Sequence, residues 1–174
     1  MQYNFQKALE ILERTPNVLN AQLKDLSDDW IFNNEGPDTF SPFDVMGHLI
    51  HGEKTDWRDR ISMLVEFGTE KTFIPYDRFA MYKESEGKSL QNLLDEFSTL
   101  RKQNISWLTS LDLTETDLDK VGMHPSLGNV RLRQLLSTWV IHDLTHTAQI
   151  ARVMAKQLKE EMGPWLAYFR IMNF

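Results

Sequence analysis

The apolar residues of this chain recur every three or four positions, which is the spacing of one face of an α-helix. The pattern predicts helices over roughly residues 5–14, 16–26, 41–67, 89–110 and 132–161. Their expected starts carry capping signals, because a Ser or Thr ahead of a proline or an apolar run favours a helix N-terminus; these are Thr15-Pro16, Ser41-Pro42 and Ser89. Strand-like alternation is weak throughout, although residues 118–123 could pair briefly. The sequence therefore predicts an all-α fold.

Three stretches between the predicted helices read as connections. Residues 27–41 contain Gly-Pro and several Asx residues, and residues 68–88 leave room for one helical turn near 78–83. The third connection covers residues 111–130. Long inserts in a compact bundle often form lids or pocket walls, so we expect residues 68–88 and 111–130 to wall any pocket. Gly163-Pro164 should end the last helix, and we expect the aromatic tail after it to pack back on the bundle.

The last helix is apolar on two sides. One track aligns His142 and His146 with core-type residues, which are Leu135, Trp139, Ile150 and Val153. The other track is formed by smaller residues, which are Val140, Leu144, Ala148, Ala151 and Ala155. A helix that is apolar on two sides must be covered on both. This helix is therefore expected either at the centre of the bundle or in a homodimer interface.

Composition narrows the class of protein. A length of 174 residues favours a single domain over 1–174. The net charge of −6 comes without any Lys/Arg cluster, which argues against a nucleic-acid partner. The N-terminus does not resemble a signal peptide and no apolar run is long enough to span a membrane, so we expect a cytoplasmic protein with no membrane partner. The absence of cysteine means that any metal must be held by His, Asp or Glu.

Histidines supply the candidate metal site. His142 and His146 are four residues apart, so in a helix both point to the same side and could hold one ion; a hydrogen-bonded pair in the core is the alternative. In the helix over 41–67, His48 lies opposite the main apolar stripe, beside small and polar residues, so this side is either an exposed polar face or the wall of a cavity into which His48 points. His51 has more solvent-like neighbours, so His48 is the favoured third ligand. Three imidazoles would leave coordination positions open, as in catalytic sites, and zinc and nickel both suit these ligands.

Other polar residues near these histidines are candidates for supporting roles. Asp143 occupies the position of the catalytic carboxylate in His-Glu-x-x-His peptidases, but its side chain is one methylene shorter, so a role behind the ligands or in helix packing is favoured. Gln149 could hold a water or substrate, and His124 could reach the pocket rim. Glu53 falls among apolar residues, which predicts a buried carboxylate paired with an arginine.

The motifs together resemble those of the DinB-like superfamily of metal-dependent enzymes, the DNA-damage-induced helical family rather than the polymerase that shares the name. The resemblance covers nearly the whole chain and rests on four segments: Gly47-His48-Leu49-Ile50-His51-Gly52-Glu53, His124-Pro125-Ser126-Leu127-Gly128, residues 135–150 with their His-Asp-x-x-His core, and Gly163-Pro164-Trp165. It implies an up-down-down-up four-helix bundle, frequent homodimers, and a nickel or zinc site on His48, His142 and His146. One departure is Arg131, where similar sequences tend to carry a helix-capping threonine.

Function follows from this resemblance only as an expectation. Related members include bacillithiol and mycothiol S-transferases and a mycothiol-dependent maleylpyruvate isomerase. A metal-dependent S-transferase acting on a low-molecular-weight thiol and an electrophile is therefore the first hypothesis. A hydrolase that uses metal-bound hydroxide is the second. A non-catalytic metal-binding or stress-related bundle is the third.

Overall fold

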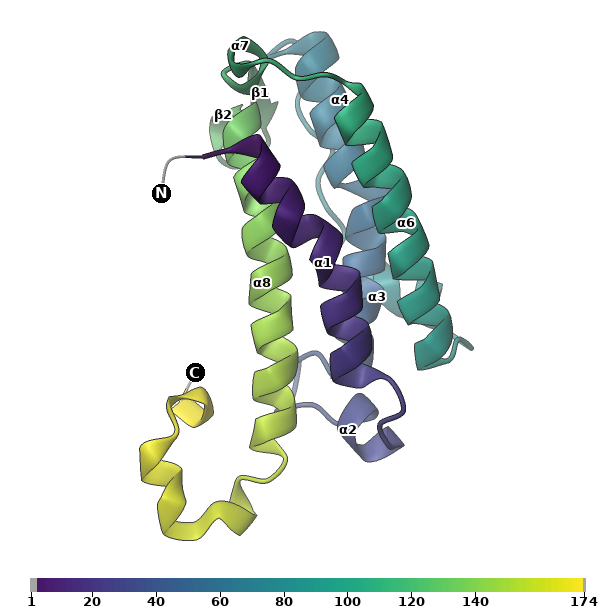
Figure 1. The fold of residues 1–174 in the computed structure, drawn as a ribbon, viewed down its shortest axis with the longest axis vertical. Helices are drawn as coiled ribbons and strands as arrows, with labels where there is room; N and C mark the ends of the chain where they lie inside the picture. Colours follow the sequence, from purple (N-terminus) through teal and green to yellow (C-terminus); the bar gives the residue numbers. More distant parts are fainter. Residues whose placement is uncertain (1–2, 174) are drawn as a thin grey trace.

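Four long helical segments lie side by side in the structure, a computed structural model that describes residues 3–173 (Figure 1). They are α1 (Phe5–Leu23), α3 and α4 placed end to end (Pro42–Thr55 and Trp57–Phe67), α6 (Leu90–Ser110) and α8 (Leu132–Lys156). In Figure 1, α1 and α8 run downward, whereas α3–α4 and α6 run upward. Both α1 and α3 contact α6 and α8. The predicted all-α, up-down-down-up four-helix bundle is therefore confirmed.

Short elements occupy the connections. These are α2 (Asp28–Phe32), α5 (Ala80–Ser85), α7 (Glu115–Leu118), the antiparallel strands β1 (Val121–His124) and β2 (Gly128–Arg131), and the 3-10 segments η1 (Glu160–Tyr168) and η2 (Arg170–Asn173). The helix turn expected near residues 78–83 is α5, and β1 overlaps the segment expected to pair briefly. The partner strand β2 was not predicted. The Met123 backbone carbonyl accepts a hydrogen bond from the Phe73 N–H at 2.9 Å, which ties the hairpin to the 68–79 segment.

The prediction that a helix ends at Arg14 is wrong, because α1 is continuous and contains Pro16. A proline inside a helix has no N–H, so the carbonyl four residues earlier loses its partner. Here that carbonyl belongs to Leu12, and it accepts a hydrogen bond at 2.9 Å from Arg101 Nη1 on α6. A side chain from another helix thus replaces the missing bond, and α1 bends partway along its length (Figure 1).

The helix expected over residues 41–67 begins as predicted but breaks near its middle. Ser41 and Asp44 cap its start reciprocally, with Ser41 Oγ accepting from the Asp44 amide at 3.1 Å. The break falls at Asp56, whose φ of −116° and ψ of −69° lie outside regular helix geometry. Gly52 permits the close approach of Trp57, because a Cβ at Gly52 would lie 3.3 Å from Trp57 Nε1. The break turns Asp56 and Trp57 toward the interior of the bundle.

The C-terminal segment differs from the expectation in two ways. Helix α8 ends at Lys156 rather than near Glu161. The aromatic tail mostly fails to pack back, since Trp165 and Tyr168 are 66% and 79% exposed. The chain leaves the axis of α8 after Lys156, Gly163 at a φ of 53° kinks the η1 segment, and the tail forms an arm beside the bundle (Figure 1). Only its last turn returns, where Met172 is buried.

The outer track of α8 is uncovered in the single chain. Leu144 and Ala148 are exposed, as is the neighbouring Ile141, so α8 is not a central helix. The expected homodimer stays a prediction, for which this track is the candidate interface.

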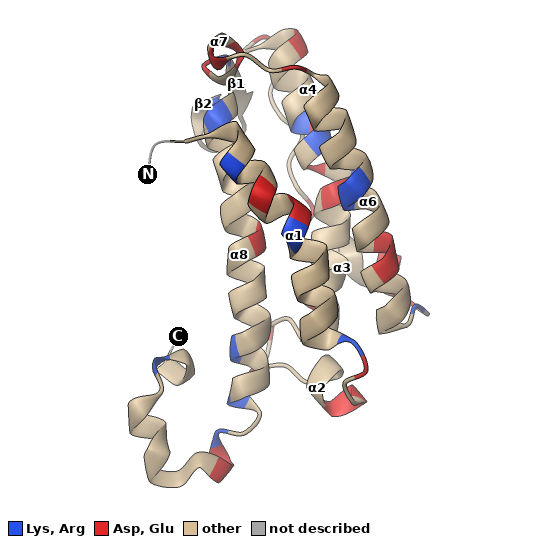
Figure 2. Cartoon of the chain, in the orientation of Figure 1, with Lys and Arg blue, Asp and Glu red and all other residues tan. Residues whose placement is uncertain are grey.

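In the view of Figure 2, basic and acidic residues are interspersed along the helices. Within residues 3–173, no helix is both long and apolar enough to cross a membrane.

Candidate metal centre

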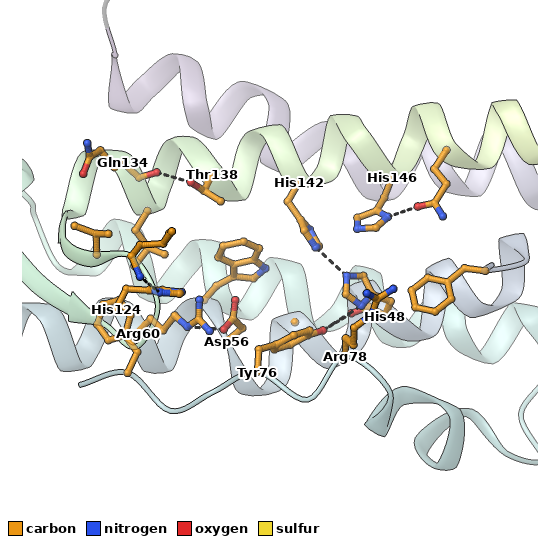
Figure 3. A pocket seen from close by; sticks show the side chains of 18 of the residues that line it. His48, Asp56, Arg60, Tyr76, Arg78, His124, Gln134, Thr138, His142 and His146 are labelled. Carbon is orange, nitrogen blue, oxygen red and sulfur yellow. Dashed lines mark hydrogen bonds and ion pairs between the residues drawn. The ribbon is translucent and has the colours of Figure 1, made fainter. Parts of the chain in front are cut away.

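Three imidazoles converge in the interior of the bundle. His48 comes from α3, and His142 and His146 come from α8 one helical turn apart (Figure 3). One ring nitrogen from each lies within 4.8 Å of the others. The Nε2 atoms of His48 and His142 are 3.0 Å apart. Zinc binds imidazole nitrogen at about 2.0–2.1 Å, which places neighbouring nitrogens of a tetrahedral site about 3.3 Å apart. The distance between the His48 and His142 nitrogens is close to this requirement, and the whole group lies within 4.8 Å.

Stacked tryptophans hold the two helices at this distance. The rings of Trp57 on α4 and Trp139 on α8 are stacked, with centroids 5.5 Å apart and planes 10° from parallel. The Trp57 ring also meets His142 edge-on at 5.1 Å. Both tryptophans are buried. The ligand-bearing stretch of α8 is therefore fixed against the α3–α4 helix by large, rigid contacts beside the histidines.

Burial keeps the imidazoles neutral. Burial, together with the neighbouring His146, Arg78 and His51, lowers the pKa of His48 to about 4. Burial likewise lowers the pKa of His142 and of His146 below the ordinary value for histidine. All three rings are uncharged at pH 7, and a neutral imidazole is the form that binds a metal ion.

Hydrogen bonds orient two of the rings. His146 Nδ1 lies 2.8 Å from Gln149 Oε1, and because a carboxamide oxygen only accepts, Nδ1 donates and the Nε2 lone pair is free to bind a cation. His48 Nδ1 lies 3.3 Å from the hydroxyl of Tyr76, which also lies 3.3 Å from the His48 carbonyl. When that hydroxyl donates to the carbonyl it can accept from Nδ1, and this tautomer of His48 also leaves the Nε2 lone pair free.

The polar atoms of His142 indicate that protein groups alone do not satisfy the cluster. Its Nδ1 is buried and has no hydrogen-bond partner among residues 3–173. Its Nε2 shares the short contact with His48 Nε2, where only one of the two nitrogens can donate. Buried polar groups are rarely left unpaired in proteins. A cation between the rings would replace the hydrogen bond between the two Nε2 atoms, and three converging imidazole nitrogens are a donor set that fits a divalent metal of the zinc or nickel type.

A cavity of about 930 Å³ opens beside the histidines. Its wall includes residues from both connections expected to form it, among them Phe73, Tyr76 and Arg78 from one and His124, Leu127 and Asn129 from the other. Charged groups from the helices also line it, including Asp56 and Arg60, which form an ion pair at 2.6 Å. Small molecules can therefore reach the space next to the three rings.

The other predicted candidates divide between the cavity and the core. Gln149 lines the cavity and contacts His146, and His124 lies in the wall. His124 Nδ1 accepts the backbone N–H groups of Ser126 and Leu127, both at 3.1 Å, so this ring holds the β1–β2 turn. Asp143 is fully buried and lies behind the ligands, outside the wall of the cavity.

The interpretation of His51 as solvent-facing is wrong. Its side chain is buried, and Nδ1 lies 2.9 Å from Glu84 Oε1 on α5, while the Tyr76 ring is 5.1 Å away. The connection over residues 68–88 folds across this face of α3 and covers it. His51 nevertheless stays outside the three-histidine group.

Behind the histidines lies a buried charge network centred on Arg101. This guanidinium uses all of its N–H groups: it donates to Glu53 and Asp143 on two helices and to the Leu12 carbonyl on a third. Trp139 Nε1 donates to Glu53 at 3.1 Å. The arginine partner expected for Glu53 is thus Arg101. The network joins α1, α3, α6 and α8 at the level of the candidate site.

Sequence reasoning missed Tyr76, Asp56 and Arg101. Tyr76 lies in a connection without periodicity, and Asp56 was hidden inside an apparently continuous helix. Arg101 could have been suspected, because it falls on the apolar face of its helix with Leu94, Phe97 and Ile105. A charged residue at such a position signals a buried partner.

Replacing Tyr76 by phenylalanine should weaken metal binding without unfolding the protein. The change removes the hydroxyl that holds His48 Nδ1, and loss of a group that orients a ligand typically costs about 10–100-fold in metal affinity. Competition for Zn²⁺ with a chromophoric chelator measures the effect. Tyr82→Phe is the control, because Tyr82 is outside the cavity wall. Equal affinities for Tyr76→Phe and wild type would contradict the role given to the hydroxyl.

Comparison with known proteins agrees with this fold. One similar solved structure is that of YfiT from Bacillus subtilis, described as a probable metal-dependent hydrolase with an unusual four-helix bundle topology. The TM-score is 0.75 at 20% sequence identity, covering 88% of this chain and 87% of that one. No match was found among curated proteins. Residues 11–150 match the family model of the DinB superfamily. The chain therefore belongs to the DinB superfamily.

Proposed function

We propose that this protein is a metal-dependent enzyme in which His48, His142 and His146 hold a divalent cation, zinc or nickel. The observation that carries the proposal is the convergence of three neutral imidazoles within 4.8 Å beside an open cavity. Among the described residues, no carboxylate joins this group. A set of three protein ligands leaves coordination positions for small molecules, which is typical of catalytic rather than structural sites.

The reaction we propose is the transfer of a low-molecular-weight thiol to an electrophile. When bound, the ion would supply a positive charge that lowers the pKa of a coordinated thiol or water. The resemblance to a superfamily whose related members include thiol S-transferases supports the thiol. The cavity of about 930 Å³ is at the upper end of small-molecule sites, so it has room for two small substrates together. The chain has no cysteine that could compete for the ion.

Hydrolysis is the second candidate, and the structural similarity to YfiT, described as a probable metal-dependent hydrolase, favours it. Here the nucleophile would be water rather than a thiol. In both reactions Tyr76 and Gln149 keep His48 and His146 in the tautomer that faces the ion, and the tryptophans shield one side of the site from solvent. The non-catalytic alternative, a metal-binding or stress-related bundle, does not account for the open cavity.

A thiol-consumption assay tests the proposal. Metal-free protein is loaded with Zn²⁺ or Ni²⁺ and given monochlorobimane with a panel of thiols, such as glutathione, cysteine and coenzyme A. We expect conjugation that requires both the protein and the metal and is absent from His142→Ala. Activity on ester or amide substrates without any thiol would instead favour the hydrolase. Metal-loaded protein that is inactive with both panels would contradict the enzyme proposal.

A further inference from the structure

Three arginines line the cavity, and two of them form ion pairs with carboxylates of the same wall. Arg60 pairs with Asp56 at 2.6 Å. Arg152 pairs with Glu35, whose carboxylate oxygens lie 3.0 and 3.1 Å from its Nε. The pKa of Glu35 is lowered by this hydrogen bond with Arg152, as expected for an ionised pair. Lys156 Nζ also lies 2.8 Å from Glu35. Both arginines therefore have a carboxylate partner within the protein.

Arg78 is the exception. Within residues 3–173, no carboxylate lies within ion-pair distance of its guanidinium, whose contacts are the ring faces of Phe40 at 5.5 Å and Phe79 at 5.0 Å. Stacking on aromatic faces restricts the orientation of a guanidinium but leaves its N–H groups unused. Figure 3 shows Arg78 beside His48, at the end of the cavity where the three histidines meet.

Arg78 places a positive charge beside the candidate metal site. Its guanidinium lines the cavity next to His48 (Figure 3). Asp38 lines the same cavity, but within the part of the chain that the structure describes no ion pair joins it to Arg78. The end of the cavity beside His48 therefore has a positive charge that no ion pair neutralises. A divalent cation held by the histidines would add to this charge, so the ion and Arg78 together would favour an anion between or beside them.

Building on the proposed metal site, we propose that the substrate carries an anionic group, a carboxylate or a phosphate, which Arg78 binds while the reacting group lies at the three histidines. A guanidinium offers two parallel N–H groups that match the oxygens of either anion. Because Arg78 lies beside His48, the anionic group and the reacting group of the substrate would be a short distance apart. Arg78 would thus be a specificity residue, which favours small charged substrates over neutral ones.

The test uses two kinds of hydroxamate on full-length protein loaded with Co²⁺, whose visible spectrum reports ligand binding. Acetohydroxamic acid binds the ion only, whereas succinyl monohydroxamic acid and phosphonoacetohydroxamic acid add a carboxylate or a phosphonate. In wild type we expect the anionic probes to bind about 10-fold tighter or more, since a charged hydrogen-bonded contact contributes that much. The stronger of the two anionic probes identifies the preferred anion.

Variants assign this preference to Arg78. In Arg78→Gln the ratio of affinities should fall to about 1, and Arg78→Lys should retain part of it because the charge remains. Arg58→Gln is the matched control: Arg58 stacks on Trp107 at 4.9 Å and is outside the cavity wall, so its loss should leave the ratio unchanged.

Two outcomes overturn the inference, and they differ. A bound cobalt spectrum with no preference for anionic probes, or with a preference that Arg78→Gln leaves intact, rejects the role of Arg78 and leaves the metal site standing. Failure of Co²⁺ to bind rejects the metal site itself, and the substrate inference falls with it.

Discussion

Replacing Arg101 by methionine is expected to destabilise the protein more than any other single change at the site. The substitution leaves Glu53 and Asp143 buried without a counter-charge and the Leu12 carbonyl without a donor. Breaking a buried ion pair on one side costs roughly 3–5 kcal/mol. That is a large share of the 5–15 kcal/mol that typically stabilises a domain. Urea denaturation, monitored by circular dichroism, measures the decrease in the free energy of unfolding. In the extreme case the variant should aggregate on expression.

A control and a compensating variant separate charge from packing. Lys102 is the neighbouring residue on the same helix and is exposed, so Lys102→Met should change stability little. A triple variant, Arg101→Met with Glu53→Leu and Asp143→Leu, removes all the charges together and should recover part of the lost stability. If Arg101→Met were as stable as Lys102→Met, the network would not hold the helices as described.

The largest functional effect is expected from His142→Ala. This ring contributes one of three ligands and makes the 3.0 Å Nε2 contact with His48. Loss of a group that only supports a ligand costs up to about 100-fold in metal affinity. Loss of the ligand itself should therefore lower Zn²⁺ affinity by more than about 100-fold. The metal-free protein should remain folded, because the ring faces the cavity and the contact with His48 is the one hydrogen bond that its side chain makes among the described residues. Elemental analysis of protein purified without an affinity tag, together with chelator competition, measures the effect.

The two histidines outside the group provide controls for His142→Ala. His51→Ala removes a buried imidazole from α3, and His124→Ala removes one from the cavity wall. Both variants should retain bound metal. Wild-type protein that contains no metal and takes up none, or a His142→Ala variant that binds as tightly as wild type, would reject the proposed ligand set.

Local signals made much of the fold predictable. The spacing of His142 and His146 and the caps at Ser41 and Ser89 depend on residues three or four apart, so a single helix is enough to interpret them. The side of α3 that His48 faces followed from the same periodicity. The convergence of His48 with the α8 pair could be stated only as a hypothesis, because it depends on how two distant helices pack.

What the sequence did not reveal depends on contacts between elements. His51 has polar neighbours on its own helix, and only the folding of α5 and Tyr76 across it makes it buried. The break at Asp56 depends on Trp57 stacking against Trp139 from α8. Trp165 looked like a core residue by type, yet the turn at Gly163 leads it into solvent. In each case residue type and periodicity were insufficient, because the deciding partner lies far away in the chain.

The bond between Arg101 and the Leu12 carbonyl bears on how the bundle assembles. Before α6 docks, Pro16 leaves that carbonyl to water, so the nascent α1 should behave as two short, fraying halves. Arrival of the guanidinium completes α1 at the same moment as it brings Glu53 and Asp143 together. Continuity of the first helix would then be a late event in folding, and the histidine cluster would form only once the whole bundle has closed.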